Sequence, residues 1–96
     1  MSSTSKQQAA ETLALRALGW IAAEERLAGA FLAASGAAAT DLVARAEDPE
    51  FLGFVLDFLL ADEAALIEFA ASAGMPPDAP MRARAALPGG FVPDWT

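Results

Sequence analysis

Carboxylates are the side chains of this sequence most suited to chemistry, and eight of them recur, singly or in pairs, at five places along the chain. The 96-residue chain has 13 Asp and Glu but no His and no Cys. Thiolate nucleophiles, imidazole acids or bases, and thiolate or imidazole ligands for zinc are therefore excluded. Each group precedes a helical pattern, where capping and the helix dipole account for it. The groups are Glu24/Glu25, Asp41, Asp48/Glu50, Asp62/Glu63 and Asp78.

Other patterns that carry chemistry are also missing. No D-x-D-x-D-G calcium loop is present, the Ser and Thr residues have no general base near them in sequence, and Gly89-Gly90 lacks the following helix or Lys of a phosphate-binding loop. The sequence predicts no catalytic, cofactor-binding or metal-ligating residue. We expect a protein that is not an enzyme and needs no cofactor, with an enzyme lacking any recognisable motif as a second alternative.

The charge balance bears on the kind of partner. Six Lys and Arg against 13 Asp and Glu give a net charge of −7. Binding to nucleic acid or to an anionic membrane surface depends on the opposite balance, so both are disfavoured. The helix–glycine–helix arrangements still leave a helix-turn-helix nucleic-acid binder as an alternative, which would use Arg45, Arg82 and Arg84.

The most apolar stretch of the sequence is PEFLGFVLDFLL, at residues 49–60. It is the element around which the charged residues must be positioned. Asp48 suits the N-cap, Pro49 the first helical position and Glu50 the positive end of the helix dipole. The apolar residues cover roughly two-thirds of the helix circumference, against a little over ~100° for an ordinary surface helix. A helix of this kind is expected at the centre of the domain.

The central helix has two chemically distinct flanks. Leu52, Leu56, Leu59 and Leu60 form one flank, which we expect to build the core, and the phenylalanines form the other. Asp57 is the one acid set within this helix. It is a partner-facing hydrogen bonder, a general base, or part of a single solvent edge with Glu50, Gly53 and Ala61. The predicted candidate partner surface is Phe51, Phe54, Asp57, Phe58 and Trp95.

Amphipathic patterns predict four further helices around this one. They cover residues 5–23, 24–35, 63–73 and about 78–87, and a short helix from an N-cap at Thr40 to Ala46 makes a fifth. Gly36 and Gly74 are predicted C-caps. The expected architecture is an all-α compact bundle of five or six short helices, with a frayed N-terminus at 1–4, a single helical domain at 5–87 and a Pro/Gly-rich tail at 88–96.

Two questions stay open at this level. The tail, with Phe91, Val92 and Trp95, either packs back over the bundle or is an exposed docking peptide. The two halves of the chain also align at a constant offset of 38 residues, from Glu24 to Asp62 and from Gly36 to Gly74. This alignment is either a true duplication or a coincidence favoured by the alanine-rich composition.

Three stretches carry a resemblance to a known family. They are ALRALGWIA at 14–22, AEDPEFLGFVLDFLLADE at 46–63 and FAASAGMPPD at 69–78. The order of residues from Ala10 to Leu87 resembles a small family of bacterial proteins, typical of alphaproteobacteria, that is known only as a domain of unknown function. The resemblance implies an all-helical cytoplasmic protein, and it supplies neither an activity nor functional residues.

A cytoplasmic location also agrees with the sequence pattern. The longest uncharged run, residues 27–40, has 14 residues, whereas a membrane span needs about 20 apolar ones. Lys6 and Glu11 precede any apolar block, unlike a secretory signal. We therefore expect a small acidic cytoplasmic protein that acts as an interaction or regulatory module, binding an unknown protein partner or a second copy of itself as a homodimer.

Overall fold

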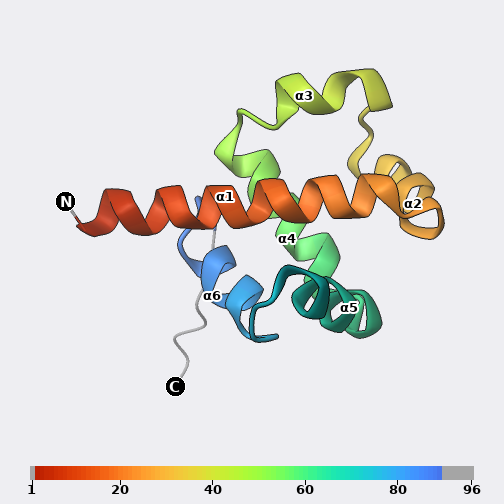
Figure 1. The fold of residues 1–96 in the computed structure, drawn as a ribbon. Helices are drawn as coiled ribbons and strands as arrows, with labels where there is room; N and C mark the ends of the chain where they lie inside the picture. The colour runs from red at the N-terminus through yellow and green to blue at the C-terminus, as the bar shows by residue number, and fades with distance from the viewer. Residues whose placement is uncertain (1, 90–96) are drawn as a thin grey trace.

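The regular structure is helical throughout residues 2–89, which are the residues that the computed structural model describes. Six α-helices and one 3-10 turn follow one another (Figure 1), and the predicted all-α class is confirmed. Their bounds are α1 (Ser2–Ala23), α2 (Glu25–Ser35), η1 (Ala39–Asp41), α3 (Leu42–Arg45), α4 (Pro49–Leu60), α5 (Glu63–Ala73) and α6 (Ala79–Ala85).

Helix α4 has the predicted bounds, and local sequence explains both ends. The Asp48 carboxylate accepts a hydrogen bond from the backbone N–H of Glu50 at 3.0 Å, and Pro49 occupies the first turn. At the other end, Asp62 begins the next helix by accepting from the N–H of Ala65 at 3.1 Å. Helix α4 therefore starts and stops where capping residues stand.

The core lies along α4, on the flank that leucines were predicted to fill. Val55, Leu56 and Leu59 are completely buried and Leu52 is 2% exposed, while Leu60 is only half-buried. Helix α1 crosses α4 and also packs on α6, as Figure 1 shows. Its buried face consists of Ala10, Ala14 and Ala17 together with Leu18 and Ile21, and the small alanine side chains let the helix backbones approach closely.

Helices α2 and α5 are built alike. Each has 11 residues, and each ends at a glycine in the left-handed conformation, with φ of 73° at Gly36 and 71° at Gly74. Each buries one central phenylalanine, Phe31 in α2 and Phe69 in α5. The two halves differ afterwards, because a 3-10 turn and α3 follow α2, whereas a proline-containing turn and α6 follow α5.

Several predicted helix boundaries differ from the structure. Helix α1 begins at Ser2 instead of near residue 5, and α6 spans 79–85 instead of 78–87. The predicted N-cap at Thr40 is wrong, because Thr40 lies inside η1. Asp41 provides the local bond instead, since its carboxylate accepts from the N–H of Ala38 at 3.4 Å and tightens the chain into a 3-10 turn.

Hydropathy within residues 2–89 gives no single helix that is long and apolar enough to cross a bilayer. Only a bent pair reaches the required length and composition, namely α2 taken with the segment Ala39–Arg45, and the two parts meet at 80°.

Candidate functional site

The phenylalanine flank of α4 is covered mainly by the chain itself. Phe31 of α2 lies in the middle of this flank, with ring centroids 5.9 Å from Phe51, 5.7 Å from Phe54 and 5.2 Å from Phe58. Two of these contacts are edge-on, an arrangement that aromatic quadrupoles favour. Phe51 is buried, while Phe54 and Phe58 are half-buried. The flank therefore serves the core first, and a part of it remains open.

The open part forms a recess where α2, α3 and the first turn of α4 meet. Its volume is about 300 Å³, the lower end of the range for ligand pockets. Phe51 and Phe54 supply aromatic surface to it, and the guanidinium of Arg45 lies 4.9 Å from the centroid of the Phe51 ring. The other lining residues are Ala34, Ser35, Asp48 and Glu50.

Asp48 and Glu50 bring negative charge to the lining of this recess, against the one positive charge of Arg45. The segment from Asp41 to Glu50 has four acids and one arginine, a local charge of −3 within the chain's −7. All four carboxylates belong to exposed residues. Helix α3 lies at the periphery of the fold (Figure 1), and of this short helix only Leu42 is packed against the core. The recess is thus an aromatic surface with an acidic rim.

Asp57 has a structural partner that the sequence did not reveal. Arg84 of α6 donates to both of its carboxylate oxygens, from Nε at 2.7 Å and from Nη2 at 3.2 Å. The same guanidinium donates to the carbonyls of Pro88 at 3.2 Å and Gly89 at 3.3 Å. Arg84 therefore ties α4, α6 and the turn after α6 together, and Asp57 belongs to this network.

The predicted single solvent edge of α4 is wrong at its centre. Glu50, Asp57 and Ala61 are exposed, but Gly53 is buried. A Cβ atom at Gly53 would stand 2.9 Å from Nη1 of Arg84. A glycine on this face lets the guanidinium lie directly on the helix backbone, which is why this side of α4 is covered by α6.

The three arginines of the helix-turn-helix alternative are not brought to one surface. Arg84 is bound to Asp57 and its side chain is only 16% exposed. Arg82 pairs with Asp78, which directly precedes α6, and Arg45 lies over Phe51. Helices α3 and α6 are also on opposite sides of α1 in Figure 1. This geometry gives nucleic acid no shared basic surface among these three residues.

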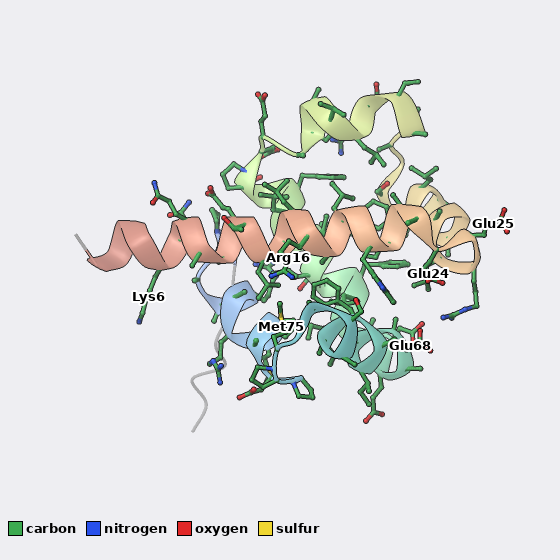
Figure 2. The ribbon with its side chains drawn as sticks, viewed as in Figure 1. Lys6, Arg16, Glu24, Glu25, Glu68 and Met75 are labelled. Carbon is green, nitrogen blue, oxygen red and sulfur yellow. The ribbon has the colours of Figure 1, made fainter. Side chains whose placement is uncertain are left out.

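A second concave region lies between α1 and α6. It is a groove of about 530 Å³, lined mostly by alanines together with Leu13. Lys6 of α1 and Arg82 of α6 provide its positive charge, and Figure 2 shows Lys6 projecting from α1 toward the side where α6 lies. The alanines are Ala9, Ala10, Ala79, Ala83, Ala85 and Ala86.

Acidic residues also gather where α2 meets α5. Figure 2 shows Glu24, Glu25 and Glu68 at this end of the molecule, and Glu68 pairs with Arg26 at 3.4 Å, with both side chains 56% exposed. No group of three or more potential metal ligands is close enough to hold an ion within the residues that the structure describes. The Arg26–Glu68 pair lies at the surface, and surface ion pairs contribute little to stability.

The fold and these surfaces define the chain as a small, acidic all-α domain. Within this class, the chain belongs to a family described as "Protein of unknown function (DUF3572)", whose model matches residues 7–90. The match contains all three stretches that carry the resemblance, so the predicted family is confirmed. Neither the comparison with curated proteins nor the comparison with solved structures found a match.

The sequence prediction and the structure agree only partly on the site. Of the five predicted surface residues, Phe51 and Phe54 line the recess, Phe58 packs on Phe31, and Asp57 binds Arg84. Trp95 lies outside the described residues. Sequence reasoning missed the role of Arg84 and the α1–α6 groove. The alanine-rich faces at Ala9/Ala10 and Ala83/Ala86 were a signal for the groove, because small side chains leave room between helices.

Proposed function

We propose that this protein is a non-catalytic protein-binding module, and that its binding surface is the recess between α2, α3 and α4. The observation that carries the proposal is the aromatic surface of Phe51 and Phe54 within an acidic rim. Partner recognition commonly combines a buried apolar anchor with a polar rim. We also propose that the protein is located in the cytoplasm, and a chain without Cys is compatible with that location.

Charge selects the kind of partner. The local charge of −3 at residues 41–50 and the total of −7 favour a partner segment that carries Lys or Arg on both sides of one large apolar residue. The apolar side chain would enter the recess against Phe54, while the basic side chains would meet Glu47, Asp48 and Glu50. Interaction with Arg45 is unfavourable for such a segment, but the Phe51 ring already holds that guanidinium.

A selection experiment tests this proposal. The full chain is immobilised and exposed to a displayed library of random short peptides. We expect the retained peptides to share one large apolar residue flanked by Lys or Arg. No enrichment, or enrichment of acidic or purely polar peptides, would contradict the proposal. Enrichment of the chain's own sequences, together with dimers in light scattering, would replace it by self-association.

A matched pair of charge reversals then locates the binding surface. Glu50→Lys reverses an exposed rim carboxylate in the first turn of α4, and Glu63→Lys makes the same change in the first turn of α5. Both variants lose the same favourable helix-dipole interaction. We expect Glu50→Lys to weaken peptide binding about tenfold at low salt, with the effect shrinking as salt is added. Glu63→Lys should leave binding unchanged, and equal effects would remove the recess as the site.

A further inference from the structure

We propose that the C-terminal residues 91–96 of this chain, FVPDWT, bind in the groove between α1 and α6. This surface is separate from the recess between α2, α3 and α4. The groove lies between two helices of a small domain, and its volume of about 530 Å³ is large enough for more than one side chain.

The lining of the groove suits large apolar side chains. Six alanines and Leu13 form most of its wall. Small side chains leave the helix surfaces hollow, and they present only methyl groups to an occupant. Phe91, Val92 and Trp95 are large apolar residues that are close together in the sequence. The alanine-lined hollow and the bulky tail are therefore complementary in size and polarity.

The place where the described chain ends brings the tail close to the groove. Gly89 is held against α6, because its carbonyl and that of Pro88 accept hydrogen bonds from Arg84. Ala86, which lines the groove, is only three residues earlier in the sequence. Tethering at this distance gives the tail a high effective concentration at the groove compared with a free peptide.

The reach of the tail is sufficient. Residues 90–96 are seven residues, which span at most roughly 23 to 25 Å when extended. The groove follows α1 from Lys6 to Leu13, a helical rise of about 10 Å. The tail can therefore pass around the end of α6, whose diameter with side chains is about 10 Å, and still lie along the groove.

Charge supports the same occupant. Lys6 and Arg82 flank the groove, and Arg82 already pairs with Asp78. Asp94 stands directly before Trp95 in the tail and supplies a carboxylate for Lys6. The family match ends at residue 90. Except for Lys6, the residues that line the groove lie within the matched portion, residues 7–90, and the proposed occupant lies after it.

Nuclear magnetic resonance of the full, unmodified chain tests the proposal. The protein has two tryptophans, and Trp20, which lies beside Phe69, serves as an internal reference. We expect nuclear Overhauser effects from the Trp95 indole to the methyl groups of Leu13 and of Ala83 or Ala86. A Trp95 indole that has no such contacts, and whose shift equals that of the free peptide GFVPDWT, would overturn the proposal.

A pair of variants links the signal to the groove. Ala9→Glu places a carboxylate on the groove wall, whereas Ala22→Glu makes the same change at an exposed site further along α1. We expect loss of the Trp95 contacts in the first variant and their retention in the second. Contacts that survive Ala9→Glu would overturn the proposal. So would contacts seen only between labelled and unlabelled molecules in a mixed sample, because the occupant would then be the tail of a second copy.

Discussion

The position of Arg84 over Gly53 makes a prediction that is opposite to the usual rule for glycine in a helix. Replacing a mid-helix glycine by alanine normally stabilises a helix by about 0.8 to 1 kcal/mol. At Gly53, however, the new Cβ would meet Nη1 of Arg84 at 2.9 Å and Cζ at 3.0 Å. The guanidinium is the end of a flexible side chain, so it would move away, and its hydrogen bonds would be lost or lengthened.

The size of that loss follows from the exposure of the two partners. Asp57 is 54% exposed and Arg84 is 16% exposed, so their pair is intermediate between a surface pair and a buried one. Discounted for solvent, the paired hydrogen bonds contribute about 1 kcal/mol. The gain in helix propensity and the loss of the pair then nearly cancel. We expect Gly53→Ala to change the free energy of unfolding by no more than about 0.5 kcal/mol.

The cancellation should disappear when Arg84 is removed. Arg84→Ala alone is expected to destabilise the protein by about 1 to 2 kcal/mol. In the Arg84→Ala background, Gly53→Ala should recover the full gain of about 1 kcal/mol, which corresponds to roughly 4 to 8 °C in Tm. Urea unfolding followed by circular dichroism measures each change, provided that the denaturant slope is constant.

Gly29→Ala provides the matched control. Gly29 lies within α2, and no atom outside its own helix is within 4 Å of the position of a Cβ. This substitution should stabilise the protein by about 1 kcal/mol in both backgrounds. If Gly53→Ala behaves like Gly29→Ala while Arg84 is present, the guanidinium does not lie on the Gly53 backbone and the reasoning is refuted.

Three further substitutions test the core, a cap and a turn. Leu56→Ala, at a completely buried site, should cost about 2 to 5 kcal/mol in urea unfolding, whereas Ile67→Ala at a 50% exposed site should cost well under 1 kcal/mol; similar losses would mean that the Leu flank is open. Asp62→Ala removes the bond to the Ala65 N–H and should lower stability by about 1 kcal/mol, a loss that Asp62→Asn should largely avoid. Gly74→Ala at φ 71° should cost about 1 kcal/mol through backbone strain alone, because no neighbouring atom is within 4 Å of the new Cβ; thermal melting that shows no change would contradict this assignment.

Much of the fold could be predicted because its helices are marked by local signals. Asp48, Pro49 and Asp62 place the ends of α4, and the glycine at position 36 ends α2, all through bonds to residues within a few positions. Thr40 was mistaken for a cap because Thr and Asp41 are both good local acceptors. The carboxylate of Asp41 makes the observed bond, and sequence alone did not rank the two.

The site was harder to predict because it depends on distant pairs. Arg84 is 27 residues from Asp57, and nothing in the spacing indicates that α6 covers the Gly53 side of α4. The sequence pattern marks the Phe flank as apolar, but it does not place Phe31 of α2 against that flank. Its ring covers most of that flank. The part of the flank that Phe31 leaves open is the recess, and its position depends on how α2 packs against α4.

The most direct test of the protein-binding account is a map of amide shift changes when the tightest selected basic peptide is titrated into the labelled full chain. We expect the changes to concentrate at Ser35, Arg45, Glu50 and Phe54, which line the recess. Glu50→Lys should suppress these changes, whereas Glu63→Lys should not. Changes centred on the α1–α6 groove or spread evenly over the acidic surface, at saturating peptide, would contradict it.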